Sequence, residues 1–92
     1  MNFFIKILLL INIPPNPFNP LTNIKFTLPK ASYVKITIYN CIGQLISEIA
    51  NGWFEEGNQN IEFNGFNLPS GVYFYKIEAG QFTQTRKMLL LK

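Results

Sequence analysis

Few residues in this 92-residue chain are able to act as an acid, a base or a nucleophile. The sequence holds no His and no Asp, and its five acids are all Glu. A Ser-His-Asp triad, a Cys-His pair and a histidine-containing zinc site are therefore excluded. Paired catalytic carboxylates need a separation of about 5–10 Å across a cleft, whereas Glu55 and Glu56 are adjacent in a predicted turn. The inventory predicts a protein that is not an enzyme and has no catalytic, cofactor-binding or metal-binding residues.

Cys41 is the single cysteine, so it has no partner for an internal disulfide. A reactive thiol needs an activating neighbour, and the chain offers neither His nor Asp for that role. We expect the Cys41 thiol to be unreactive and partly buried.

Three aromatic residues could bind a ligand without covalent chemistry. Tyr33, Tyr39 and Trp53 fall at outward positions of predicted strands, and aromatic rings stack on the apolar faces of sugars. A carbohydrate-binding or adhesive module is therefore an alternative function. The competing interpretation is that these rings form cross-strand pairs that stabilise a wet sheet face.

Composition favours a single β-rich domain. Hydrophobic residues make up 48% of the chain and charged residues 14%, which argues against intrinsic disorder. The net charge is +3, and its only local cluster is Arg86-Lys87 with Lys92, which lacks the dense basic stripe of a nucleic-acid-binding surface. No nucleic-acid partner is expected.

Alternating apolar residues predict the strands. Positions 23–28 place Ile24, Phe26 and Leu28 on one face, and positions 33–39 place Val34, Ile36 and Ile38 inward with Thr37 outward. Positions 72–77 point three large side chains toward the core. These are Tyr73, Tyr75 and Ile77.

Turn residues separate further strands. Gly43 permits a positive φ in a turn after Asn40. Asn51-Gly52 is typical of a hairpin, which would send Trp53-Phe54 back along the sheet. Leu68–Gly71 fits a type I turn with Pro69 at its second position and Gly71 at its fourth. Residues 44–50 form a strand of blurred alternation anchored by Ile46, and residues 60–64 a short strand with Ile61 and Phe63 on one face. Glu78–Gln81 predicts a tight hairpin.

The last segment, 82–92, is predicted to be a strand that becomes apolar on both faces from Met88 to Leu91, as in a strand covered on two sides. Together these elements predict an all-β, antiparallel Ig-like β-sandwich of six to seven short strands.

Several markers occur in order along the chain and carry a resemblance to one family. The Pro-rich marker consists of Asn16, Pro17, Phe18, Asn19 and Pro20, and the closing marker of Lys87, Met88, Leu89, Leu90, Leu91 and Lys92. Between them stand Ile24–Phe26, Ile38–Asn40 with Gly43-Gln44, and Leu68–Tyr73. This set resembles the type A C-terminal sorting domain of the type IX, or Por, secretion system, which is related to the Ig-like domain of the flagellar hook-capping protein.

The resemblance implies a non-catalytic label. Such domains direct a covalently linked passenger through the periplasm and across the outer membrane, to the cell surface or the medium. The implied partners are the type IX translocon and a sortase-like peptidase. We expect residues 87–92 to be recognised by the translocon through strand pairing, with closure of the sheet by 88–91 as the competing interpretation.

The beginning of the chain departs from the family pattern. Residues 1–13 are an apolar leader, interpreted as a degenerate signal, an edge segment, or, as we favour, the remnant of a truncated reading frame. Residues 14–22 are a Pro/Asn-rich lead-in, and residues 23–92 form the expected sandwich.

Overall fold

The computed structural model describes residues 8–12 and 21–91. The markers at 16–20 and Lys92 lie outside these residues. Seven strands are present in the described part of the chain. They are β1 (Leu8–Asn12), β2 (Leu21–Leu28), β3 (Ser32–Asn40), β4 (Leu45–Phe54), β5 (Gly57–Asn64), β6 (Gly71–Ala79) and β7 (Phe82–Leu90).

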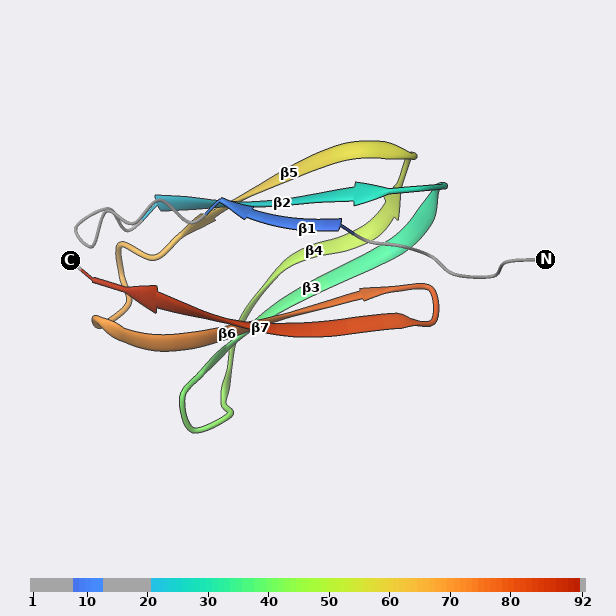
Figure 1. Cartoon of the computed structure of the whole chain (residues 1–92). Helices are drawn as coiled ribbons and strands as arrows, with labels where there is room; N and C mark the ends of the chain where they lie inside the picture. Colours follow the sequence, from blue (N-terminus) through green and yellow to red (C-terminus); the bar gives the residue numbers. More distant parts are fainter. Residues whose placement is uncertain (1–7, 13–20, 92) are drawn as a thin grey trace.

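Two antiparallel sheets face each other as a sandwich (Figure 1). One sheet has the strand order β1-β2-β5 and the other the order β4-β3-β6-β7. The chain changes sheet after β2, after β4 and after β5, whereas β3–β4 and β6–β7 are hairpins within one sheet. The predicted antiparallel Ig-like β-sandwich is therefore confirmed.

The core lies between the sheets, and all the inward residues that alternation predicts in β2, β3 and β6 belong to it. Ile24, Phe26 and Leu28 of β2 are buried against the inward residues of β3 and β6. Phe26 also meets the partly buried Phe54 edge to face, with ring centroids 6.2 Å apart. The other buried apolar residues are Val34, Ile36, Ile38, Ala50, Phe63, Tyr73, Tyr75, Ile77, Ala79, Met88 and Leu90.

The prediction of a hairpin at Asn51-Gly52 is wrong. Both residues lie inside β4, opposite Lys35 and Val34 of β3, and Trp53-Phe54 ends that strand. The chain turns instead at Glu55-Glu56, where it crosses to the other sheet. Register along β3 and packing of Phe54 on the core override the local preference of Asn-Gly for a turn.

The blurred alternation of β4 has a structural cause. The β3–β4 register shifts twice, between Ile36 and Thr37 and between Ile38 and Tyr39. Each shift leaves one residue of β4 without a direct partner, namely Ile49 and Ile46, as at a β-bulge. Ile46 packs against the core but is only partly buried, so its predicted role as core anchor is confirmed in part.

Loop details differ from the predictions in two places. The hydrogen-bonded turn before β6 spans Gly65–Leu68, where the Leu68 N–H donates to the Gly65 carbonyl at 3.0 Å; it comes before the predicted 68–71 turn. Thr37 has the predicted outward parity but is buried, with only 3% of its surface exposed. The predicted hairpin after β6 is confirmed as the two-residue loop Gly80-Gln81.

Candidate recognition surface

Among the described residues β7 pairs with β6 alone, so it forms one edge of the four-stranded sheet. Its ladder with β6 runs without a register shift from Ala79↔Phe82 to Gly71↔Leu90. Segment 82–90 contains no proline. By contrast β4, the opposite edge, carries two register shifts. Bulges protect an edge from pairing with another strand, so β7 is the more open edge of this sheet.

The residues predicted for recognition divide between the core and the solvent. Met88 and Leu90 are buried, and Lys87 is exposed. Leu89 keeps 57% of its surface exposed, so the prediction that 88–91 is covered on two sides is wrong. An edge strand of a sandwich has only one face against the core, which explains the difference. Leu91 is partly exposed.

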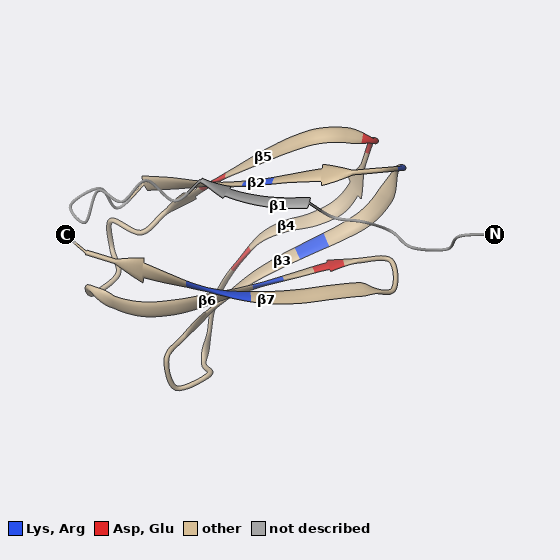
Figure 2. Ribbon diagram, viewed as in Figure 1, with Lys and Arg blue, Asp and Glu red and all other residues tan. Residues whose placement is uncertain are grey.

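Basic residues gather on β6 and β7 (Figure 2). Lys76 of β6 forms an ion pair with Glu78 at 3.9 Å. Arg86 donates from Nε and Nη2 to the side-chain oxygen of Gln84 at 2.7 Å, in the amide orientation that satisfies both groups. Neither Arg86 nor Lys87 has an ion pair with a carboxylate of the described residues.

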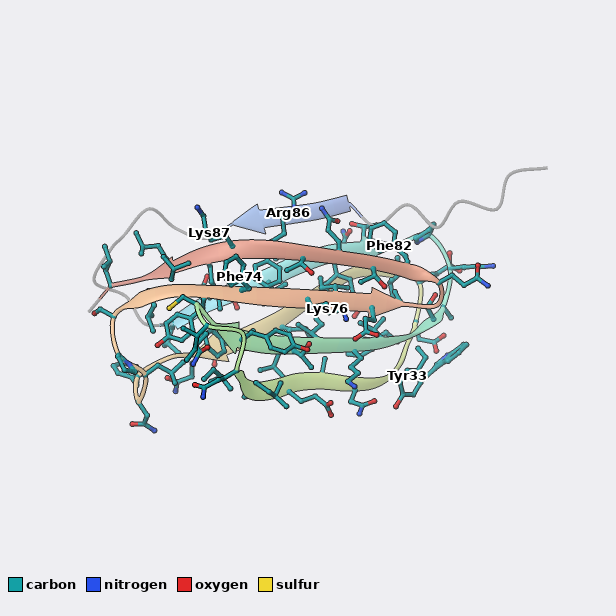
Figure 3. All side chains as sticks on the ribbon, turned by 90° about the horizontal axis from the view of Figure 1, so that it is seen from below. Tyr33, Phe74, Lys76, Phe82, Arg86 and Lys87 are labelled. Atoms are coloured by element: carbon teal, nitrogen blue, oxygen red, sulfur yellow. The ribbon has the colours of Figure 1, made fainter. Side chains whose placement is uncertain are left out.

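Arg86 and Lys87 lie on opposite faces of β7. Directly opposed residues of neighbouring strands share a face. Arg86 is opposite the buried Tyr75, and Lys87 is opposite Phe74 on the outer face. Figure 3 shows both side chains on β7, with Tyr33 toward the opposite edge of the sheet. The two cations therefore flank the open edge of β7.

Tyr75 is fully buried, and its hydroxyl has no hydrogen-bond partner among the described residues. Burial raises the pKa of Tyr75 to about 12, because the tyrosinate would lose its hydration, while the Arg86 charge opposes this shift. Tyr75 thus stays neutral at physiological pH.

Tyr73 has a different role from Tyr75, although both point inward from β6. Its hydroxyl donates to the Pro69 carbonyl at 2.7 Å. This bond connects the start of β6 to the loop that crosses between the sheets. Our sequence reasoning placed Tyr73 in the core but missed the hydrogen bond; the spacing of Pro and Tyr in Leu68–Tyr73 is the signal that could have revealed it.

The β3–β4 loop is organised by Asn40. Its side-chain oxygen accepts from the Ile42 and Gln44 amides at 3.1 and 2.9 Å, and the Gly43 amide donates to the Asn40 carbonyl at 3.0 Å. Gly43 has a φ of 85°, which confirms the predicted positive φ. Cys41 is exposed at this loop tip, so the expectation of a partly buried thiol is wrong.

Comparison with known families gives one match. The sequence matches the family described as "Secretion system C-terminal sorting domain" over residues 12–91. The chain belongs to this family. Its domain is a sorting signal for type IX secretion, which implies interaction with that machinery and export to the cell surface or the medium. None of the curated proteins matches the chain.

The aromatic residues of this sorting domain do not form one platform. Tyr33 and Trp53 are register partners and keep 53% and 65% of their surfaces exposed. Tyr39 lies six residues along β3, a distance of about 20 Å in a strand, and is partly buried. Its hydroxyl accepts a hydrogen bond from Thr37 at 3.3 Å. The arrangement is that of a cross-strand pair and a separate packed ring, which does not favour a sugar-binding face.

The acidic residues of the sorting domain are dispersed. Glu55 and Glu56 are exposed between β4 and β5, and Glu48 pairs with Lys35 at 3.8 Å. Within the described ranges, no group of three or more His, Cys, Asp or Glu residues could hold a metal ion. The same ranges contain no helix that is long and apolar enough to cross a membrane.

Proposed function

We propose that the chain is a type A sorting domain, related to the Ig-like domain of the flagellar hook-capping protein. In this proposal it labels a passenger joined ahead of the Pro-rich lead-in (residues 14–22). The translocon recognises the domain in the periplasm, and a sortase-like peptidase removes it during attachment or release. In this proposal the sorting sandwich comprises residues 23–92 together with the edge strand β1 (Leu8–Asn12) of segment 1–13, which pairs with β2.

The observation that supports this proposal best is the open edge of β7 in a member of a sorting family. A partner strand can pair with such an edge through main-chain hydrogen bonds, and side chains beside the edge then provide specificity. Residues 87–92 are the proposed recognition segment. Within it, Lys87 and Leu89 are exposed while Met88 and Leu90 are anchored in the core.

The direct test fuses the domain to a periplasmic reporter with its own export signal, in a bacterium that has the type IX system. Deleting the whole recognition segment would also remove two core residues, so Leu89→Asp is the sharper change. Ile42→Asp is the matched control, because Ile42 is also an exposed apolar residue, 74% exposed in the β3–β4 loop.

We expect the unaltered fusion and Ile42→Asp to place the reporter outside the cell, and Leu89→Asp to leave it in the periplasm. Retention of the unaltered fusion would contradict the sorting function itself. Normal export of Leu89→Asp would remove the recognition segment from the proposal and leave sorting in place.

A further inference from the structure

The backbone groups that β7 offers to a partner follow from the turn before it. Gly80 has a φ of 59° and no described residue other than glycine has a positive φ, so the two-residue loop Gly80-Gln81 is a type II′ turn. That turn makes its flanking residues, Ala79 and Phe82, a hydrogen-bonded pair. Hydrogen-bonded and non-hydrogen-bonded pairs then alternate along an antiparallel ladder.

This alternation assigns the outward backbone groups of β7. Starting at Thr83, every second residue of β7 is in a non-hydrogen-bonded pair with β6, so its N–H and C=O point away from β6. These residues are Thr83, Thr85, Lys87 and Leu89. A partner strand would therefore hydrogen-bond to these four residues.

The side chains along the same edge specify the chemistry of that partner. Segment 82–91 contains Arg86 and Lys87 and no acid. Because adjacent residues of a strand point to opposite faces, one partner residue can meet only one of these two cations. Two adjacent acidic residues in the partner would meet both, and apolar residues beyond them would cover Leu89 on one face and extend the core beside Leu90 on the other.

We propose that the partner of this domain is an extended protein segment that adds to β7 as a fifth strand, with two adjacent acidic residues opposite Arg86 and Lys87 and an apolar stretch opposite Met88–Leu90. This inference rests on the proposed sorting function and names the chemistry of the recognising segment. The alternative source of negative charge, an anionic lipid surface, would use the same cations without strand pairing.

The cellular test reverses the two charges. Arg86→Glu with Lys87→Glu is compared with Lys25→Glu and Lys30→Glu, which change the net charge equally at exposed positions of β2 and the β2–β3 connection. Circular dichroism and thermal unfolding check that each variant folds. We expect export of the fused reporter to fall at least about tenfold for the first pair only, and the swap Arg86→Lys with Lys87→Arg to retain export.

If the unaltered fusion is exported and the reversed pair is exported equally well, the acidic partner is wrong and sorting stands. If the unaltered fusion is not exported, the sorting function fails instead. A loss of export in both reversed pairs would point to net charge and overturn the specific role of Arg86 and Lys87.

Amide hydrogen exchange on the purified chain distinguishes pairing with a partner strand from binding to an anionic lipid surface. The probes are an acetylated, amidated peptide with two adjacent glutamates flanked on both sides by valines and isoleucines, which fits parallel and antiparallel addition alike, the same peptide with lysines in place of glutamates, and phosphatidylglycerol vesicles. We expect only the glutamate peptide to slow exchange at Thr83, Thr85, Lys87 and Leu89. The proposal is overturned if both peptides protect these amides equally, or if neither peptide does. It is also overturned if the vesicles bind through the two cations without protecting these amides.

Discussion

The Tyr73 hydroxyl donates a hydrogen bond to the Pro69 carbonyl at 2.7 Å. Tyr73 is buried near the start of β6, and Pro69 lies in the loop that brings the chain from one sheet to the other. A tyrosine whose hydroxyl binds the backbone a few residues upstream at such a corner is a recurrent feature of Ig-like sandwiches. The bond connects this crossing loop to the start of β6, the strand that pairs with β7.

The two inward tyrosines of β6 should respond differently to loss of their hydroxyls. Tyr73→Phe removes the bond to Pro69 and should lower the free energy of unfolding by about 1–2 kcal/mol. Tyr75→Phe removes a buried hydroxyl that has no partner among the described residues and should be neutral or stabilising. Urea unfolding of both variants measures the difference. Equal destabilisation by the two changes would contradict the role assigned to Tyr73.

Tyr75 should also make the domain less stable in alkali. Its pKa is raised from 10.0 to about 12 in the folded state by burial. Above pH 10 the unfolded chain releases this proton while the folded chain retains it, so stability falls between pH 10 and 12. The contribution lost is roughly 1–3 kcal/mol. The free energies of unfolding of the unaltered chain and of Tyr75→Phe are measured across this pH range. If the two free energies fall in parallel between pH 10 and 12, the prediction is refuted.

Gly43 and Gly52 form a matched pair for testing backbone conformation. A Cβ at either position would meet no atom within 4 Å, but only Gly43 has a positive φ, of 85°. Gly43→Ala should therefore destabilise the domain by about 1 kcal/mol. Gly52→Ala should be neutral or slightly stabilising, because Gly52 lies in the extended strand β4 and an alanine there restricts the unfolded chain. Thermal unfolding compares them, and a larger loss for Gly52→Ala would be inconsistent with this assignment.

Hydrogen exchange of the free protein tests the open edge of β7 directly. The amides of Gln84, Arg86, Met88 and Leu90 face β6 and should exchange at least about tenfold more slowly than those of Thr83, Thr85, Lys87 and Leu89. Backbone NMR resolves the individual residues. Uniform protection along β7 would mean that its outer edge is already covered in solution.

Much of the fold follows from alternation within strands that have one face in the core. For Ile24, Val34 and Tyr75 the period of two was enough to predict full burial, because a one-residue slip would expose every apolar side chain of the strand. The errors arose where tertiary pairing overrides local preference. Asn51-Gly52 has the composition of a turn, yet continued pairing of β4 with β3 keeps it extended.

The candidate site was less accessible to sequence reasoning. The apolar run from Met88 to Leu91 does not indicate which strand lies beside β7. Whether one or both faces of the run are buried depends on its position in the sheet. The cluster Arg86-Lys87 was visible, but its position at an open edge depends on the order β4-β3-β6-β7. Strand order is set by contacts between distant residues, which alternation does not encode.

As a sorting signal, this domain should direct export by the type IX system. The most direct measurement is the fraction of a reporter found outside the cell when residues 12–92 are fused to its end, in otherwise identical strains with and without a working type IX translocon. We expect the reporter to leave the cell only when both the fusion and the translocon are present. A reporter that stays in the periplasm in both strains, or leaves the cell in both, would contradict it.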